Sequence, residues 1–334
     1  MNDTTVLTLI LNFRTPEMTL RSAAAALAAM DGLPGEVLII DNGSDDGSFK
    51  ALQAGAEARG WLQGGRLRVQ ASARNGGFGA GMNIGFAQTL STGERPDVYY
   101  LLNSDAFPDP DCIRHLRDFL GRTPRAGLAG SFVQGEDSVP HCTLFRFPTI
   151  ASEFEGAART GVISRLLHHA IVPLPIPQHP QQVDWTAGAS LMIRRAVIDE
   201  IGGFDERFFL YFEETELCHR AARAGWQTYY VPQSRVTHVG SVSTGMKTWT
   251  RTPDFWFTSR LYYFTRTHGA LYAAVATFAR LAGGAVYGLR RLLNGKPRAE
   301  AKGFYFDLIR HGLRSLISPA RAPRRGTSLS EESK

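Results

Sequence analysis

Three acidic side chains stand close together at one point of the chain, where they could remove a proton from a hydroxyl group. Glu213, Glu214 and Glu216 open a segment that has the spacing of a helix over about 213–224. A carboxylate among like charges has a raised pKa, which suits a general base. A structural explanation is also available, because acids favour the first turn of a helix and Glu216 can pair with Arg220. The residues alone leave both explanations open.

Two further carboxylates, Asp41 and Asp105, follow apolar runs that are typical of buried strands. Asp41 could accept hydrogen bonds from a nucleobase or a ribose. Asp105 could bind Mg²⁺ or Mn²⁺, because these hard cations prefer oxygen ligands and commonly bridge a carboxylate to phosphates. Strands end in polar residues in any protein, since turns are polar, so this plainer explanation stays open for each residue taken singly. Together the carboxylates suit a site for a nucleotide diphosphate and a cation.

The elements that would position these residues alternate between strand and helix. Apolar, β-rich runs predict strands buried on both faces at 6–11, 36–41, 67–70 and 98–102. Helical segments at about 16–30, at about 46–59 and from the glycine-rich run after Asn75 to about 90 separate them. This order predicts an α/β fold with a mixed, mostly parallel sheet flanked by helices. Ligands bind such sheets beyond the carboxyl ends of the strands. Those ends carry the polar runs Asn12–Arg14, Asp41–Asn42, Arg74–Gly76 and Asn103–Asp105.

The second half of the chain has a weaker pattern. Periodicity fades over about 134–182, where four prolines fall within eight residues, and this predicts a surface excursion. Residues 183–193 predict one strand with small residues at its middle, and 227–231 predict another. From Phe255 onward the pattern predicts long helices.

The composition is that of an ordinary globular protein. Of 334 residues, 43% are hydrophobic and 20% charged, which excludes a disordered chain and supplies ample material for a core. Cys112, Cys142 and Cys218 form no CxxC pair, which argues against a disulfide framework and a thiolate zinc site and fits a reducing compartment. Asp3 precedes a short apolar run, so we interpret the N-terminus as a first strand and not as an export signal.

Several common motifs are excluded by spacing. Gly77, Gly79, Gly81 and Gly85 do not match GxGxxG, because the last glycine lies one position too far along the chain. The sequence also lacks GxxxxGK[ST], HExxH and GxSxG. A nicotinamide-dependent oxidoreductase, a P-loop enzyme, a zinc protease of that class and an α/β-hydrolase are therefore disfavoured.

Charge is unevenly distributed along the chain. Residues 1–245 carry a formal charge of −5, whereas residues 246–325 carry fifteen Lys and Arg against three acids, a formal charge of +12. A basic surface favours polyanions, such as anionic lipid headgroups or nucleic acid. The acidic front argues against nucleic acid, because a groove that tracks a phosphate backbone should be basic.

Residues 269–289 are apolar apart from Arg280 and long enough to cross a bilayer. An arginine in mid-span costs roughly 2.5–3.5 kcal/mol, so interfacial and buried placements are kept beside a spanning one. Aromatic residues interleave with arginines around this segment, which predicts an interfacial surface or a dimer face. The residues are Trp249, Phe255, Trp256, Tyr262, Tyr263 and Phe264, with Arg251, Arg260 and Arg266.

The chain resembles the inverting family 2 glycosyltransferases of the GT-A (Rossmann-like) fold, in their bacterial rhamnosyltransferase-like branch. The resemblance covers about the first 245 residues and is most specific in the block GGFDERFFLYFEETELCHRA. The matching segments are 6–14, 38–47 (LIIDNGSDDG), 74–86 (RNGGFGAGMNIGF), 100–108 (YLLNSDAFP), 183–194 and 202–243. It implies a GT-A domain over 1–245, with its donor part at about 1–133 and its acceptor and catalytic part at about 183–245. Residues 246–334 are then a helical, basic, membrane-associating or dimerising region with a flexible tail.

The resemblance also implies roles for single residues on the donor side. Asp41 contacts the nucleobase or its sugar, and Asp105 is the metal-side carboxylate of the motif that is Asp-x-Asp in many members. Asn103 replaces the first Asp of that motif, which leaves dependence on Mg²⁺ or Mn²⁺ in doubt. His238 matches a histidine that completes the metal shell in some relatives. The other expected nucleotide-sugar contacts are Asn12, Arg14, Asn75, Gly76, Asn103 and Trp185.

On the acceptor side, Glu214 stands where the family's catalytic base falls, with Glu213 beside it. Trp185 and the small residues 187–189 are expected to form the floor under the sugar and acceptor. For Trp185 a place in the core is an equally good explanation, and for His238 an ordinary position near a strand end is also kept.

The resemblance implies that the protein transfers a sugar with inversion at the anomeric carbon. The first expectation for the donor is dTDP-rhamnose, so that the sugar is rhamnose. The acceptor is a glycan or a lipid-linked glycan in bacterial cell-surface polysaccharide synthesis, such as that of lipopolysaccharide. We expect the protein to be peripheral on the cytoplasmic face of the inner membrane, where it would bind anionic lipid. A homodimer is a further possible partnership. The first alternative is a galactofuranosyl- or other UDP-sugar transferase. An alternative of another class is a non-catalytic protein that binds a nucleotide or nucleic acid.

Overall fold

A computed structural model describes residues 3–240, 249–295 and 297–317. The chain divides into two compact units. The first consists of Met1–Phe145, Pro175–Glu206 and Glu213–Thr244, and the second of Arg146–Leu174, Arg207–Phe212 and Gly245–Lys334. The second unit therefore joins the C-terminal region with two earlier segments that the sequence analysis did not assign to it.

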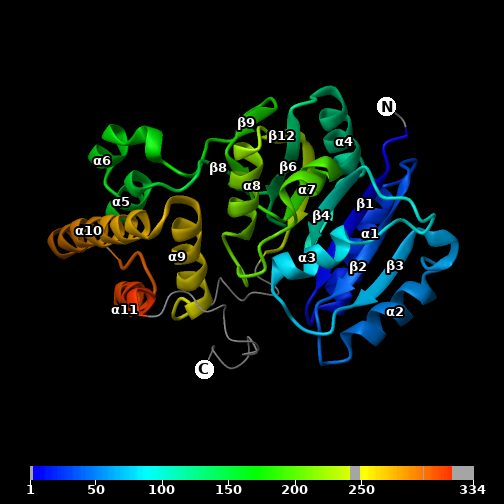
Figure 1. Ribbon diagram of the computed structural model, residues 1–334, viewed down its shortest axis with the longest axis horizontal. Helices are drawn as coiled ribbons and strands as arrows, with labels where there is room; N and C mark the ends of the chain where they lie inside the picture. The colour runs from blue at the N-terminus through cyan, green and yellow to red at the C-terminus, as the bar shows by residue number, and fades with distance from the viewer. Residues whose placement is uncertain (1–2, 241–248, 296, 318–334) are drawn as a thin grey trace. The chain divides into compact units, whose positions relative to one another are not determined.

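The first unit is built on a mixed sheet with the strand order β3-β2-β1-β4-β11-β6-β12-β5 (Figure 1). β3, β2, β1 and β4 pair in parallel, whereas β11 runs antiparallel to both of its neighbours. Two short strands, β7 and β9, pair with β6 and β12. The strands are β1 Val6–Asn12, β2 Gly35–Asp41, β3 Leu67–Ala71, β4 Val98–Asn103, β5 Ala106–Pro108, β6 Ala126–Gln134, β7 Pro140–His141, β9 Gln181–Val183, β11 Ser190–Arg194 and β12 Gln227–His238.

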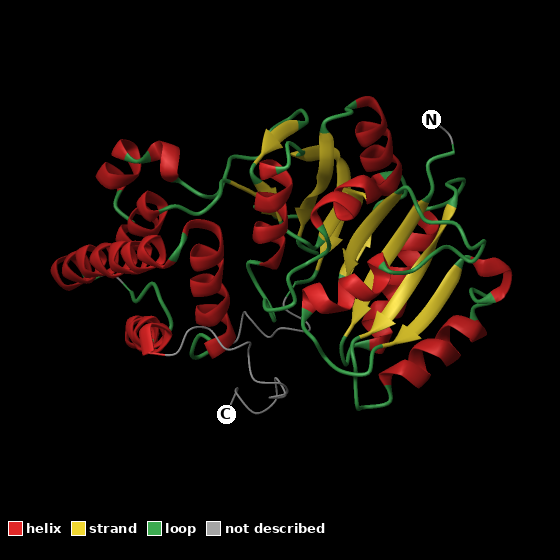
Figure 2. Cartoon of the chain, viewed as in Figure 1, coloured by secondary structure: helices red, strands yellow, loops and turns green. Residues whose placement is uncertain are grey.

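Helices flank this sheet, which confirms the predicted fold class (Figure 2). They are α1 Pro16–Ala29, α2 Ser48–Ala58, α3 Phe78–Phe86, α4 Cys112–Arg122, α7 Arg195–Ile201 and α8 Glu213–Arg223, with a short 3-10 turn, η1, at Gln63–Gly65. Both faces of β1 are buried, as its continuous apolar run predicts. Ile10 lies in the main apolar cluster with residues of α1 and α4. On the other face, a Cβ at Gly81 or Gly85 of α3 would stand 2.3 or 2.6 Å from a Leu11 or Leu9 methyl carbon, so these glycines let α3 pack closely on β1.

The predicted single strand over 183–193 is wrong, because the structure divides it into three. β9 ends at Val183, β10 (Trp185–Thr186) pairs with β8 (Leu144–Phe145) in a separate two-stranded sheet, and β11 begins at Ser190 in the main sheet. The small residues between β10 and β11 allow the chain to leave one sheet and enter the other. The break brings the backbone of Gly188 near the head of α8.

The second unit is helical. It contains α5 Ile150–Ala158, α6 Gly161–Leu166, the 3-10 turn η2 His168–Ala170, α9 Asp254–His268, α10 Ala270–Asn294 and α11 Phe304–Ile317. The long C-terminal helices were predicted, but α5 and α6 correct the predicted irregular excursion. A capping box of Thr149 and Ser152 starts α5. α5 then packs so closely on α10 that a Cβ at Gly283 would lie 2.4 Å from the Phe154 carbonyl oxygen.

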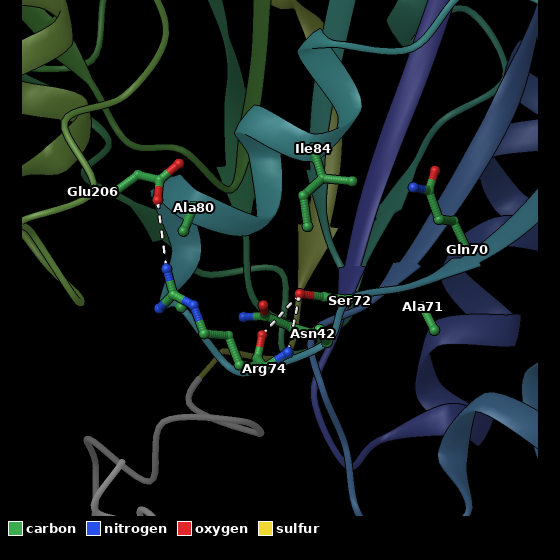
Figure 3. A pocket seen from close by; sticks show the side chains of 10 residues that line it. Asn42, Gln70, Ala71, Ser72, Arg74, Ala80, Ile84 and Glu206 are labelled. Carbon is green, nitrogen blue, oxygen red and sulfur yellow. Dashed lines mark hydrogen bonds and ion pairs between the residues drawn. The ribbon is translucent and has the colours of Figure 1, made fainter. Parts of the chain in front are cut away.

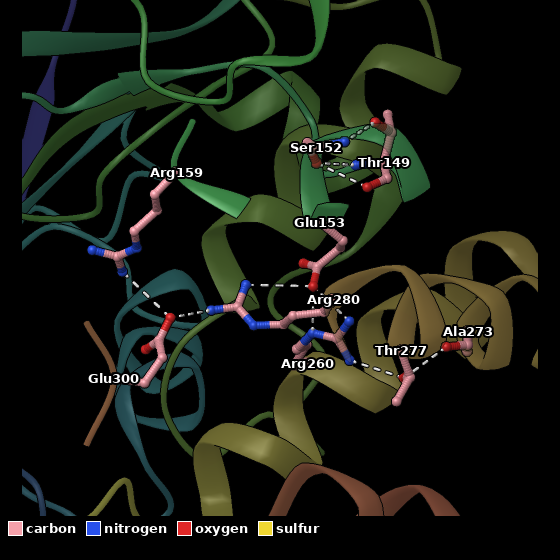
Figure 4. A network of polar contacts seen from close by, with 9 residues as sticks. All are labelled: Thr149, Ser152, Glu153, Arg159, Arg260, Ala273, Thr277, Arg280 and Glu300. Carbon is pink, nitrogen blue, oxygen red and sulfur yellow. Dashed lines mark hydrogen bonds and ion pairs between the residues drawn. The ribbon is translucent and has the colours of Figure 1, made fainter. Parts of the chain in front are cut away.

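A buried network of charges holds these helices together (Figure 4). The Arg260 guanidinium, 1% exposed, donates two hydrogen bonds to Glu153 Oε2, at 2.7 and 3.1 Å. Arg280 donates to the same oxygen at 3.4 Å and pairs with Glu300 at 3.3 Å. Burial raises the pKa of the Glu153 carboxyl, but the charges of Arg260 and Arg280 outweigh burial and lower that pKa.

The interleaved aromatic residues and arginines, which the sequence analysis assigned to an interfacial surface or a dimer face, make many of their contacts within this unit. None of the six aromatic side chains is exposed. Tyr263 and Phe264 are fully buried, and Trp256 packs against Phe304 with ring centroids 5.5 Å apart. Arg251 and Arg260 pair with Asp307 and Glu153 of the same unit, so much of the pattern serves contacts within this unit.

In the described part of the chain, α10 is the one helix that is long and apolar enough to cross a membrane, with a mean hydropathy of 1.3 over its most apolar 18 residues. Only 22% of its most apolar window is buried within the protein. Its mid-helix arginine, Arg280, is occupied by Glu153 and Glu300.

Glu153→Gln tests the charge network. We expect it to lower the free energy of unfolding of the second unit by about 3–5 kcal/mol, because two arginines lose their buried counter-charge. The lowered pKa means that the stabilisation is present above the ordinary Glu value of about 4.3 and is lost as the pH falls below it. Urea unfolding at pH 7 and pH 3.5 measures both effects. Glu155→Gln is the matched control on the same helix, since Glu155 accepts a hydrogen bond from Ser164 that Gln can keep. Equal losses in the two variants would contradict this role of the network.

Candidate active site

Asn12 and Asp41 meet at the carboxyl edge of the sheet, because β1 and β2 pair in a register that places them side by side. Asn12 Nδ2 donates to Asp41 Oδ1 at 2.6 Å, and the backbone N–H of Ser44 donates to Asp41 Oδ2 at 3.2 Å. Asn12 Oδ1 in turn accepts a hydrogen bond from Thr19 at 2.7 Å. Both side chains of the pair are buried, so the Asp41 carboxylate is held in one orientation.

Three loops that follow β1, β2 and β3 are bound to one another. The backbone N–H of Arg14 donates to Ser44 Oγ at 3.0 Å, and the Arg14 guanidinium pairs with Asp45 at 2.5 Å. Arg14 adopts a left-handed backbone conformation, with φ of 57°. At Gly43, φ is 68° and a Cβ would lie 2.4 Å from the carbonyl carbon of Arg74. Only glycine allows the second and third loops to approach this closely.

Asn42, which the sequence analysis did not select, connects these loops. Its Nδ2 donates to Asn75 Oδ1 at 3.0 Å and to the Gly77 carbonyl at 3.1 Å, which fixes the amide orientation. Its Oδ1 is buried and has no hydrogen-bond partner among the described residues. The only feature of the sequence that could have indicated a role for Asn42 is its position directly after Asp41 at the end of a strand.

A pocket of about 360 Å³ lies beside these loops (Figure 3). Arg74 Nη2 and Glu206 Oε2, two of its lining side chains, are 3.7 Å apart. The pocket is lined by Asn42, Gln70, Ala71, Ser72, Ala73, Arg74, Gly76, Ala80, Ile84 and Glu206. Of the residues expected to contact the donor, Gly76 lines this pocket and Asn75 adjoins it.

Asp105 and His238 meet where β5 pairs with the end of β12. His238 Nε2 lies 3.0 Å from Asp105 Oδ1 and 3.4 Å from Asn103 Nδ2. The two residues proposed from the sequence as metal ligands are thus brought together, although they are 133 positions apart. No cluster of three or more His, Cys, Asp or Glu side chains that could hold a metal occurs in the described ranges.

This pair of donors fits a substrate-completed divalent cation site. Mg²⁺ and Mn²⁺ are commonly bound by one or two protein ligands together with phosphate oxygens and water. An oxygen from Asp105 and a nitrogen from His238 converge on one point, as such a site requires. Asn103, whose amide lies beside His238, adds no carboxylate to it.

Glu213 and Glu214 begin α8, and neither carboxyl has a basic partner among the described residues. Glu213 is buried, whereas Glu214 is half-buried with its Oε2 atom enclosed. Burial raises the pKa of Glu213 well above its ordinary value, and the neighbouring Glu214 raises it further. Burial also raises the pKa of Glu214, although a hydrogen bond from the Gly188 backbone N–H opposes that rise. One oxygen of each carboxyl, Oε2, is buried with no hydrogen-bond partner among the described residues. A carboxyl in this state is suited to taking up a proton near neutral pH.

Glu216 differs from its two neighbours. Arg220 Nε lies 2.8 Å from both of its oxygens, as the helical spacing predicted. Arg220 also donates to the carbonyl oxygens of Ile201 and Gly203, at 2.6 and 2.7 Å. Glu216 is therefore a structural residue, and the explanation as a general base stays a prediction for Glu213 and Glu214.

Trp185 lies in the small two-stranded sheet, three positions before Gly188. Its ring stacks on Phe145, with centroids 4.2 Å apart and an interplanar angle of 21°. The side chain is half-buried. A contact of Trp185 with the sugar or the acceptor stays a prediction.

Comparison with known proteins decides the family. A sequence model of the family described as "Glycosyltransferase like family 2" matches residues 5–261. The chain belongs to this family. It is an enzyme that transfers glycosyl groups, so the non-catalytic alternative is wrong.

Two curated relatives agree with the rhamnosyltransferase-like branch. The N-acetylglucosaminyl-diphospho-decaprenol L-rhamnosyltransferase of Mycobacterium tuberculosis is 29% identical over 262 residues, which cover 72% of this chain and 78% of the relative. Rhamnosyltransferase WbbL of Escherichia coli is 38% identical over 169 residues, covering 48% of this chain and 60% of the relative.

Among solved structures, the mannosyltransferase PcManGT from Pyrobaculum calidifontis, in complex with GDP-Man and Mn²⁺, has a similar fold. Its TM-score is 0.55 at 13% sequence identity, covering 94% of this chain and 81% of that one. This likeness supports the GT-A fold of the glycosyltransferase.

Variants of the acidic cluster should change stability in opposite directions. Because the folded protein favours protonated Glu213, ionisation above the ordinary pKa destabilises it, and the neutral Gln removes that cost. We expect Glu213→Gln to raise the free energy of unfolding by about 1–2 kcal/mol at pH 8, with a smaller gain at pH 5. Glu216→Gln should lower it by about 1.5–3 kcal/mol, since Arg220 loses its charge partner. Chemical unfolding at both pH values measures this, and a loss of stability in Glu213→Gln at pH 8 would contradict the assignment.

Proposed function

We propose that this glycosyltransferase moves rhamnose from a nucleoside-diphosphate donor to a hydroxyl group of a glycan or lipid-linked glycan, with inversion at the anomeric carbon. The observation that carries the proposal is the unneutralised carboxyl of Glu214 at the head of α8, within a family 2 fold. The two curated relatives are both named as rhamnosyltransferases, which supports rhamnose as the sugar. The first donor to test is dTDP-rhamnose, and a UDP-sugar such as UDP-galactofuranose is the alternative.

The donor nucleotide is proposed to bind at the carboxyl edge of β1, β2 and β3. Asp41, held by Asn12 and Ser44, offers carboxylate oxygens to N–H or O–H groups of the base or ribose. Arg14 and the loop containing Asn75 and Gly76 border the same edge. Their contacts with one another mean that the site is formed before the nucleotide arrives, which reduces the ordering cost of binding.

The diphosphate is proposed to lie beside Asp105 and His238, which would hold Mg²⁺ or Mn²⁺. When bound there, the cation supplies positive charge for the leaving diphosphate. The Mn²⁺ in the PcManGT structure supports this assignment. Asp105 and His238 contribute orientation, because their side chains already converge at 3.0 Å. Asn103 is uncharged, so it adds no charge to the cation site. Its proposed role is to position His238 and to hydrogen-bond the nucleotide sugar through its amide.

Glu214 is proposed to accept the proton of the acceptor hydroxyl as its oxygen attacks the anomeric carbon. The new carbon–oxygen bond forms on the face opposite the departing diphosphate, and that single displacement inverts the centre. The Gly188 N–H holds one side of the carboxyl, while its buried Oε2 has no hydrogen-bond partner in the described part of the chain. Glu213 supports Glu214 by placing a second raised-pKa carboxyl beside it.

The acceptor is proposed to be carried by lipid, so that the enzyme works at the cytoplasmic face of the inner membrane. The diphospho-decaprenol in the name of the mycobacterial relative supports a lipid-linked acceptor. The +12 charge of residues 246–325 supports attraction to anionic lipid headgroups. In this proposal the chain contributes to the synthesis of bacterial surface polysaccharide.

Glu214→Gln tests the catalytic base. Gln keeps the size and hydrogen-bonding capacity of the side chain but cannot accept the proton, so we expect turnover to fall by roughly 10²–10⁴, with the donor KM nearly unchanged. Initial rates with dTDP-rhamnose and a lipid-linked glycan acceptor measure both constants. Glu213→Gln is the matched control and should retain more activity. If Glu213→Gln causes the large loss and Glu214→Gln does not, the base is Glu213.

Thermal unfolding with a panel of nucleotide sugars tests donor identity and metal use together. A ligand that binds the native state raises Tm, so dTDP-rhamnose with Mn²⁺ should give the largest shift in the panel. Asp105→Asn should remove the part of the shift that depends on Mn²⁺ and abolish turnover. Asp109→Asn, which changes an exposed acid directly after β5, is the control. Full activity of Asp105→Asn, or of the wild type in excess chelator, would exclude the metal from the reaction.

A further inference from the structure

One face of α10 is apolar and exposed along the whole helix. The side chains of Leu271, Phe278, Leu289 and Leu292 are 80%, 70%, 61% and 79% exposed. At 100° per residue these positions, with Val275 and Leu293, fall within about 60° of a single line along the helix. Three neighbours within the same sector, Ala274, Ala282 and Ala285, are also uncharged. We call this surface the α10 stripe.

The opposite face of α10 is committed to the other helices of its unit. Arg280, about half a turn around the helix from Leu271 and Leu289, points to Glu153 and Glu300 (Figure 4). Gly283 packs against α5, and Gly284 packs against Tyr305 of α11. The two sides of the helix therefore differ. On one side the Arg280 charge is neutralised by Glu153 and Glu300, and on the other side the stripe presents only apolar side chains.

Four cationic residues that lie near the stripe along the chain have no acidic partner among the described residues, although Arg291 is on the side of α10 opposite the stripe. Arg291 is on the last turn of α10, Arg298 and Lys302 lie in the connection to α11, and Arg314 lies near the end of α11. None of the four forms an ion pair with a described acidic residue. α11 carries an apolar exposed row of its own, at Phe306, Ile309 and Leu313.

We infer that the α10 stripe inserts into the surface of an anionic phospholipid bilayer, with α10 lying in the membrane plane. An interfacial helix has this division into an apolar face without charge and flanking cations. A second copy of the chain fits the surface less well, because a twofold contact would bring together the net positive charge of residues 246–325 of both copies. The inference rests on the proposed membrane association. It replaces a purely electrostatic attachment with insertion of named side chains.

The double variant Phe278→Gln/Leu289→Gln tests insertion. Wild-type protein should co-sediment with vesicles of phosphatidylglycerol and phosphatidylcholine, and a substantial fraction should stay bound in 1 M NaCl, because salt screens charges but not apolar contacts. The double variant should partition at least tenfold more weakly at 0.15 M NaCl and be released at 1 M. The control Leu62→Gln/Val139→Gln changes two exposed apolar residues of the first unit and should bind as the wild type does. Thermal unfolding verifies that the variants fold, which their exposed positions predict.

Three results would overturn the inference. The first is equal vesicle binding by the stripe variant and the wild type, and the second is complete release of the wild type by salt. The third is a wild-type dimer, detected by light scattering, that the stripe variant converts to monomers while vesicles bind neither protein. Donor binding in the thermal assay keeps this test separate from the proposed function. Lost vesicle binding with intact donor binding contradicts the insertion alone, whereas failure of every nucleotide sugar with intact vesicle binding contradicts the proposed function.

Discussion

The register between parallel strands is the constraint on which the candidate site depends. β1 pairs with β2 so that Asn12 stands beside Asp41, and it pairs with β4 so that Leu11 stands beside Asn103. A shift of one residue in either pairing would move the polar side chains away from one another. It would also turn the apolar side chains of the strand to the opposite face of the sheet, which would disrupt their packing in the core. The core that stabilises the sheet therefore also aligns the donor-side residues. No separate interaction is needed to bring them to one edge.

Neutralisation distinguishes the acids that maintain the structure from those that are available for chemistry. Glu153 and Glu216 are buried with arginines, and each holds helices or loops in place. Glu213 is buried and Glu214 half-buried, neither has such a partner among the described residues, and burial raises the pKa of both. A protein retains an uncompensated buried carboxyl only where the surrounding fold enforces it. Position in a helix could not separate Glu214 from Glu216, because both belong to the same acidic first turn.

The sequence predicted the elements up to Asn103 well, because each strand there is an apolar run that ends in polar residues. It made no prediction for β5, α4 or β6. It predicted the meeting of Asp105 and His238 only through the family resemblance, since nothing local connects β5 with β12. The short helix α5 was missed because its burial depends on α10, more than one hundred residues away. The aromatic residues near Trp256 are half-buried or buried, which the sequence could not show for a similar reason. Periodicity shows that a helix is amphipathic, but the packing of a partner helix determines which of its side chains are buried.

Gly43 shows how a residue can control binding without touching a ligand. Its backbone has a left-handed conformation, and the chain of Arg74 and Asn75 occupies the space where a side chain would begin. Any larger residue would push the loop after β3 away from the loop after β2, although Asp41 and Asn75 would both still be present. In a genetic screen for lost donor use, position 43 would score like a contact residue. Over evolutionary time the two loops are thus free to vary in sequence only as long as that one position stays without a side chain.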